Sequence, residues 1–338
     1  MLLIHPPVSK PCEPPAGLAR LAGCLKRHGI GCTLIDANRE ALLSRDAAGF
    51  GTAQDTWTRR AVRHYRRHIT LLTQWPGYVD HARYTRAVSD INRALHAAAA
   101  PAGVSLSLAD YQDADLSPVQ SRDLLTAAEH PQRNPFYAYF SRRIAEALDA
   151  QRPGLVGFSL NYLSQALTTF AMMGQVRRLM PGTRIVLGGS LVTSWMSRSG
   201  QLPVFDGLVD DLVAGPGEER LTRLAGALPH DSPCLPDYAS LFESPYLAPG
   251  PILPYSASSG CYWNRCTFCP ERLETTGYVG RPPSQVIQEL RTLIEQTDPI
   301  LIHLLDSALS PALLKALADH PLPVPWYGFA RVTRELAD

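Results

Sequence analysis

The sequence has little of what would tie a protein to nucleic acid or to a membrane. Its 338 residues carry 32 Lys and Arg against 31 Asp and Glu, which gives a formal net charge of only +1 at pH 7. No run approaches the ~18 consecutive apolar residues of a membrane-spanning helix, and the first seven residues lack the charged lead of a secretory signal peptide. We therefore expect a cytoplasmic protein with no membrane partner and no nucleic-acid partner.

Disulfide and phosphate-binding patterns are absent as well. The seven cysteines show no pairing pattern, which is typical of a chain kept in a reducing compartment. No G-x-x-x-x-G-K phosphate loop occurs, and Gly215-Pro216-Gly217 lacks the G-x-G-x-x-G spacing of dinucleotide-binding proteins. The length and the 45% share of apolar residues predict about two packed domains.

What the sequence does contain is a group of three cysteines. Cys261, Cys266 and Cys269 are spaced C-x-x-x-x-C-x-x-C, and the nearest other cysteine is Cys234. Structural zinc takes four ligands, and electron-carrying iron–sulfur clusters normally take four thiolates. Three thiolates on a four-iron cluster would leave one iron open to a small molecule. Two alternatives are a zinc loop completed by a distant ligand, such as Cys234 or a histidine, and a cysteine group without metal.

The N-terminal part alternates strand and helix patterns. The apolar patterns predict helices over 16–28, 163–179 and 218–228, and strands over 2–4, 32–36, 155–159, 184–188 and 211–214. Such alternation predicts an α/β fold with a doubly wound parallel sheet. Residues 40–150 interrupt it with helical patterns and no strong strand, and we expect this insertion to cover the ligand edge of the sheet. Its segment 58–68 has five arginines and two histidines, which indicates either a solvated helix face or a docking site for an acidic substrate.

Ligands of parallel sheets bind beyond the carboxyl ends of the strands. Small or polar residues follow the predicted strands, and we predict that they contact a cofactor. These residues are Ser159, Asn161, Gly188, Gly189, Ser190, Gly215, Gly217 and Glu218. The alternative is that they form ordinary strand-to-helix turns, which use the same residue types.

The C-terminal part reads as the beginning of a (β/α) barrel. Strands are predicted over 251–255, 299–305 and 324–329, with helices over 283–296 and from Ser310-Pro311 onward. The cysteine group, Asp306 and Arg331 then follow three successive strands. Barrel enzymes place their chemistry at these carboxyl ends.

The stretch from Ser259 to Pro270 resembles the cluster loop of the radical S-adenosylmethionine (radical SAM) enzymes, whose usual first gap is one residue shorter. An α/β domain directly before such a loop resembles the cobalamin-binding domain of the cobalamin-dependent members, whose late turns look like 187–190 and 213–219. The loop, together with 235–238 and 251–255, is most similar to the subgroup that matures ribosomally made peptides (RiPPs). The resemblance thus implies residues 1–245 as the cobalamin-binding-like domain and 246–338 as the first part of the radical SAM barrel.

The resemblance also implies cofactors and roles. Cys261, Cys266 and Cys269 would hold a 4Fe-4S cluster whose open iron binds S-adenosylmethionine, and an electron donor would drive its reductive cleavage. Phe268 would pack beside the nucleoside, and Asp306 would contact the amino group unless it caps the next turn. Cobalamin would supply a methyl group to a peptide or natural-product substrate. The chain has no D-x-H-x-x-G motif, so cobalt would have no histidine ligand.

The family barrel has six strand–helix units, whereas about two and a half precede Asp338. The resemblance therefore implies a truncated catalytic barrel, either in a fragment or in a chain that a partner completes. Two other functions fit the sequence: a non-catalytic protein that binds cobalamin or another ligand, and a zinc-stabilised interaction module.

Overall fold

The computed structural model describes residues 1–43, 55–200, 202–228, 234–269 and 277–332. Its first unit is built on a five-stranded sheet of order β2-β1-β5-β6-β7, in which every neighbouring pair is parallel. The strands are β1 (Leu2–His5), β2 (Thr33–Asp36), β5 (Leu155–Ser159), β6 (Arg184–Gly188) and β7 (Asp211–Val213). This is a doubly wound order with its switch point between β1 and β5. The predicted α/β fold with a parallel sheet is confirmed.

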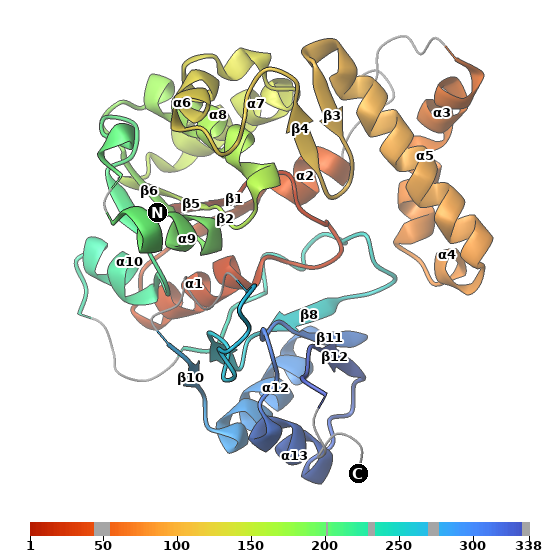
Figure 1. Ribbon diagram of the computed structural model, residues 1–338, viewed down its shortest axis with the longest axis vertical. Helices are drawn as coiled ribbons and strands as arrows, with labels where there is room; N and C mark the ends of the chain where they lie inside the picture. The colour runs from red at the N-terminus through yellow and green to blue at the C-terminus, as the bar shows by residue number, and fades with distance from the viewer. Residues whose placement is uncertain (44–54, 201, 229–233, 270–276, 333–338) are drawn as a thin grey trace.

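Helices cover both faces of this sheet (Figure 1). Because side chains alternate along a strand, Leu2 and Ile4 pack on one side with α2 (Ala37–Leu43), α7 (Tyr137–Gln151) and α8 (Leu163–Leu179). Leu3 points to the other side, toward α1 (Ala16–Arg27) and α10 (Glu218–Leu224). The predicted last helix of this unit is too long: α10 ends at Leu224 because Gly226 follows with φ +82°. Helix α9 (Ser190–Ser199) and the 3₁₀ turn η4 (Pro203–Phe205) connect β6 to β7.

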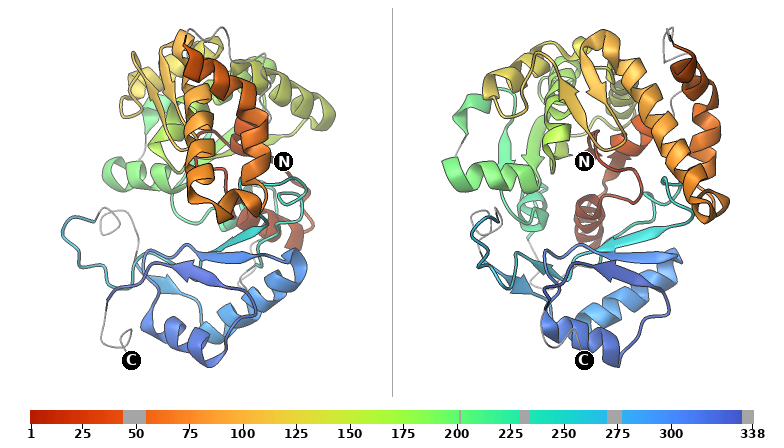
Figure 2. Two further views of the ribbon diagram at one scale, coloured as in Figure 1. Left: turned by 90° about the vertical axis from the view of Figure 1, so that its right-hand side faces the viewer. Right: turned by 45° about the vertical axis from the view of Figure 1, so that its right-hand side comes forward.

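The insertion between β2 and β5 is mostly helical. It contains α3 (Thr56–Leu72), α4 (Pro76–Val79), α5 (His81–Ala99), α6 (Ser121–Glu129) and the 3₁₀ turns η2 (Ala100–Ala102) and η3 (Pro131–Arg133). Helices α3, α4 and α5 form a separate group beside the rest of the first unit (Figures 1 and 2). A short antiparallel hairpin, β3 (Val104–Leu106) with β4 (Tyr111–Asp113), was not anticipated from the sequence.

The second unit is a three-stranded parallel sheet of order β12-β11-β8. Its strands are β8 (Ile252–Tyr255), β11 (Leu301–Leu304) and β12 (Trp326–Gly328), and its helices are α12 (Pro283–Thr297) and α13 (Pro311–Asp319). Leu253, Ile302 and Leu304 pack with both helices in one core. Ser310 caps α13, since its hydroxyl accepts the N–H of Leu313 at 3.3 Å. This strand–helix alternation is the one predicted for the beginning of a barrel.

The two units are fastened together by side chains of the first unit. The phenol of Tyr246 donates to the Asp36 carboxylate at 2.8 Å, and the guanidinium of Arg39 donates to the carbonyl of Leu241 at 2.6 Å. Glu13, in the loop after β1, lies 2.8 Å from Nδ1 of His303 on β11. The second unit lies below the first in both views of Figure 2. In the described parts of the chain, no helix has the length and apolar character needed to cross a bilayer.

Candidate cofactor site

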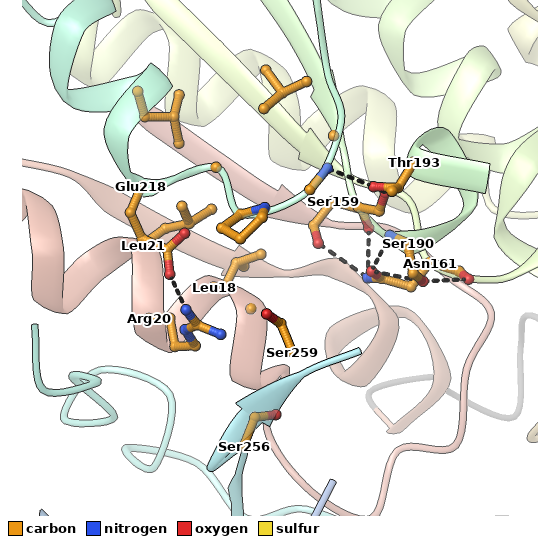
Figure 3. Close-up of a pocket in the computed structure, with 18 of the residues that line it drawn as sticks. Leu18, Arg20, Leu21, Ser159, Asn161, Ser190, Thr193, Glu218, Ser256 and Ser259 are labelled. Atoms are coloured by element: carbon orange, nitrogen blue, oxygen red, sulfur yellow. Dashed lines mark hydrogen bonds and ion pairs between the residues drawn. The ribbon is translucent and has the colours of Figure 1, made fainter. Parts of the chain in front are cut away.

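A cavity of about 430 Å³ lies where the carboxyl ends of strands from both sheets meet (Figure 3). The first sheet contributes the ends of β5, β6 and β7, α1 forms one side, and the ends of β8 and β11 close it from the second unit. The volume is within the usual range for small-molecule sites. All eight strand-end residues singled out in the sequence line it, together with Asp306: Ser159, Asn161, Gly188, Gly189, Ser190, Gly215, Gly217 and Glu218.

Hydrogen bonds among the strand-end residues hold one wall of the cavity in place. The Asn161 side-chain amide donates to the hydroxyl of Ser159 at 3.0 Å, and its oxygen accepts the N–H of Ser190 at 3.1 Å. The Ser190 hydroxyl donates to the backbone oxygen of Asn161 at 3.0 Å. Figure 3 shows the three side chains converging at the same edge. Hydroxyl and amide groups are therefore held in fixed positions along this wall of the cavity.

Two glycines of the cavity, Gly189 and Gly215, both have a positive φ but differ in the space around them. Gly189 has φ +115°, and a Cβ there would collide with the backbone of Leu160, so only glycine fits. Gly215 has φ +72°, but nothing lies within 4 Å of the position a Cβ would take. Its N–H donates to the hydroxyl of Thr193 at 2.8 Å. The space beside Gly215 is therefore open to a ligand, while its N–H is already used by Thr193.

The charged residues among the described lining residues are few. Arg20 of α1 and Glu218 of α10 form an ion pair at 2.5 Å, so the predicted cofactor residue Glu218 already has a partner. Apolar side chains such as Leu18, Leu21 and Val213 form much of the remaining wall. The cavity thus suits a largely neutral ligand with amide or hydroxyl groups.

Asp306 joins the ends of two strands of the second sheet. Its side chain is buried, accepts the N–H of Ala257 at 3.0 Å and also accepts the hydroxyl of Ser258. The sequence left open an amino-group contact or a cap on the following turn. The structure instead directs the carboxylate toward the residues that follow β8. Asp306 still lines the cavity, so its predicted contact with a ligand remains a prediction.

The three-cysteine loop begins at the cavity wall, because Ser258, Ser259 and Gly260 line it. Strand β9 (Ser258–Ser259) pairs with β10 (Val279–Gly280), which brings the two ends of the loop together. Gly260 and Asn264 have φ of +72° and +43°, and these left-handed residues turn the loop sharply.

The three thiols are of the kind that holds an iron–sulfur cluster, but they are not gathered around one point. Cys261, Cys266 and Cys269 are free and partly exposed, and the N–H of Cys269 donates to the carbonyl of Cys266 at 3.3 Å. Among the described residues, no three His, Cys, Asp or Glu side chains are placed to hold a metal ion. Their role as metal ligands therefore stays a prediction.

Cys234, the distant zinc ligand considered above, belongs to another part of the molecule. Its thiol interacts with that of Cys24 on α1, and burial together with this neighbour raises the pKa of Cys234 to about 11. The thiol neighbour of Cys234 is thus on α1, and its part in a zinc loop stays an untested alternative.

Trp263 and Phe268, two aromatic residues of the cysteine loop, differ in their surroundings. Trp263 lies between two arginines, with the guanidinium of Arg331 3.3 Å and that of Arg265 5.1 Å from its ring centroid. Arg331 therefore ties the loop to the segment that follows β12. Phe268 is 88% exposed and is not among the residues that line the cavity, so its packing beside a nucleoside stays a prediction.

Sequence reasoning missed several residues of the cavity. Arg20, Thr193 and Ser307 line it, yet none belongs to a recognisable motif. Ser256 could have been found, because it begins a run of small polar residues directly after β8. The described part of the insertion does not cover this edge as expected, because no described residue between 22 and 156 lines the cavity.

Comparisons with known proteins add a distant structural likeness. No family model and no curated protein matches the sequence. Among solved structures, the chain is similar to TsrM, a radical S-adenosylmethionine methyltransferase from Kitasatospora setae with a tryptophan substrate and the SAM analog aza-SAM bound. The identity is 14% and the TM-score 0.48, and the match covers 94% of this chain and 49% of that chain. This chain thus spans about half the length of that protein, and a likeness at this level assigns it neither an activity nor a ligand.

Proposed function

We propose that the chain is a radical SAM enzyme that uses cobalamin to methylate, or otherwise modify, a peptide or natural-product substrate. One observation carries the proposal. The three-cysteine loop starts from the wall of the same cavity that the glycine and hydroxyl turns of the parallel sheet line. A loop of metal-binding residues and a cofactor-type sheet edge therefore serve one space.

The cysteine loop is the proposed cluster site. Cys261, Cys266 and Cys269 would hold a 4Fe-4S cluster, and an external electron donor would reduce it. When bound, the cluster supplies the reductive cleavage of S-adenosylmethionine, and cobalamin supplies a methyl group. Asp306 would position the residues between β8 and the loop, since it accepts hydrogen bonds from both Ala257 and Ser258.

The parallel sheet is the proposed cobalamin site. The periphery of cobalamin carries many amide groups, which the hydroxyls of Ser159 and Ser190 and the open backbone at Gly215 can bind. The described residues that line the cavity include no histidine, so cobalt would have no histidine ligand from them. The apolar walls would exclude water from the reacting groups.

Metal analysis under anaerobic conditions tests the proposal. The chain is purified without oxygen and reconstituted with iron and sulfide, and iron, sulfide, zinc and cobalt are measured per chain. Absorption spectra are recorded before and after addition of S-adenosylmethionine. We expect about four irons and four sulfides with a spectral change on addition, and cobalamin that co-purifies or binds tightly. About one zinc without sulfide would overturn the proposal and leave a structural metal module.

A further inference from the structure

A second cavity, of about 700 Å³, lies between α3 and α5 of the insertion. These two helices, with α4, form the separate group at the side of the molecule in Figures 1 and 2. None of its lining residues lines the first cavity. They are Arg60, His64, Arg67, His68, Thr70, Leu71, Gln74, Asp80, Ala82, Arg83 and Arg86, which we call the arginine groove.

The charge of the arginine groove differs sharply from that of the whole chain. Four guanidinium groups line it against a single carboxylate, whereas the chain as a whole has a net charge of only +1. Within the described residues, none of the four arginines forms an ion pair. A concave site lined by one sign of charge focuses the field on a ligand of the opposite sign.

The acidic groups near the groove are already engaged. The carboxylate of Asp80 caps α5 by accepting the N–H of Arg83 at 3.1 Å, and Asp90 accepts a hydrogen bond from Nε2 of His68 at 3.1 Å. Nδ1 of His68 is buried and has no hydrogen-bond partner among the described atoms. The positive charge of the groove is therefore not neutralised from within.

We propose that the arginine groove binds an acidic peptide segment. Guanidinium groups pair with carboxylates through two parallel hydrogen bonds, and all four cations here are arginine. Arg60 and Arg67 are seven residues apart on one helix, a rise of about 10 Å. In an extended polyproline-type peptide, every third side chain points the same way at a spacing of about 9 Å. Glutamates at every third position would therefore meet both arginines.

Nucleic acid is the less suitable ligand for this groove. Proteins that hold single strands stack bases on aromatic rings, and the described lining residues include no Phe, Tyr or Trp. A duplex binder that contacts about six to ten phosphates needs more cations than the four arginines of this groove. Leu71, Gln74 and Ala82 instead offer the small apolar and amide contacts that suit a peptide backbone.

Peptide binding to the full chain tests this inference without any cluster or S-adenosylmethionine. A fluorescein-labelled peptide with glutamate at every third position is titrated and followed by anisotropy. We expect saturable binding that weakens as salt is raised from about 50 to about 300 mM. A double variant, Arg67→Ala with Arg86→Ala, should lose about tenfold in affinity. Arg63→Ala, an exposed arginine of α3 outside the groove, should change it by less than about twofold.

Three results would overturn the proposal. These are equal affinity of the double variant and the Arg63→Ala control, equal binding of a peptide with glutamine in place of glutamate, and tighter binding of a single-stranded oligonucleotide of equal charge. Thermal unfolding verifies that each variant folds. Should the alanine double variant not fold, Arg67→Gln with Arg86→Gln keeps most of the side-chain volume and must show the same loss.

Discussion

Replacing Asp306 should separate its role in the fold from a role in ligand binding. The side chain is 4% exposed and accepts two hydrogen bonds from the residues that follow β8. In Asp306→Ala, the N–H of Ala257 is left buried without an acceptor, which costs about 1–3 kcal/mol. Ser258 is half-buried and can turn its hydroxyl toward water, so its loss adds about 1 kcal/mol. We therefore expect Asp306→Ala to lower the free energy of unfolding by about 3 kcal/mol.

Asp306→Asn should be much milder. The amide oxygen can still accept the N–H of Ala257, and the hydroxyl of Ser258 can rotate to accept from the amide nitrogen. The two hydrogen bonds then no longer involve a charged carboxylate, and this change costs about 1 kcal/mol. Urea unfolding followed by tryptophan fluorescence measures both variants, and Trp326 on β12 lies in the same sheet. Asp319→Ala, an exposed residue of α13, is the control and should stay within about 0.5 kcal/mol.

The same pair of variants addresses the ligand. If Asp306 also contacts the amino group of S-adenosylmethionine, Asp306→Asn keeps its fold yet binds S-adenosylmethionine more weakly than the unaltered chain. The hydrogen bonds of Asp306 do not stabilise the fold as described if Asp306→Ala costs less than about 1 kcal/mol, or if alanine and asparagine destabilise the chain equally.

The cysteine loop, the turn at Gly189 and the buried His5 each lead to a measurable expectation. In Cys266→Ala, reconstituted iron and sulfide should fall from about four each to near zero, while Cys234→Ala keeps them; an intact cluster in the first variant contradicts the assignment. Gly189→Ala should destabilise the chain by more than about 2 kcal/mol in thermal unfolding, whereas Gly182→Ala, with open space and no positive φ, should be nearly neutral. Burial lowers the pKa of His5 below its ordinary value of 6.5. The unfolded chain therefore takes up this proton first, and stability should fall as the pH drops below about 6.5, by at most about 1.4 kcal/mol per pH unit. His5→Gln should flatten this dependence in unfolding measured from pH 7.5 to 5.5, and an unchanged slope counts against it.

Local patterns predicted most of the regular structure. The ranges expected for α8 and β6 agree with the structure residue for residue, because both follow long apolar patterns between clear turn residues. The hairpin of β3 and β4 was missed since each strand has only three residues, too few to show alternation. Val104, Leu106 and Tyr111 are buried there because β3 packs on α5 and β4 packs on α8, which comes much later in the sequence. Tertiary contacts of this kind leave no local signal.

Part of the candidate site could likewise be predicted from the sequence, and part could not. Strand-end residues could be brought together from sequence, because the carboxyl ends of parallel strands lie on one edge of a sheet. Arg20 could not, since its place in the cavity depends on how α1 packs beside α10. The insertion was placed wrongly because a helical pattern says nothing about the direction in which a long connection leaves the sheet. The arginine groove of the insertion could not be predicted either, because it forms only where α3 and α5 pack side by side.

Helix α1 contacts both units and therefore fixes the first cavity between them. Its Leu18 packs against the first sheet, whereas Ala19, the next residue, belongs to the core of the second unit. Gly23 lies one turn further along the same face, where a Cβ would collide with the backbone of Leu235. The carbonyl of Ala19 accepts the N–H of Asp237, so the chain that leads to β8 is fixed directly on this helix. The third face of α1 lines the cavity. One rigid helix therefore sets the distance between the glycine turns and the start of the cysteine loop, and a ligand that touches both must match that spacing.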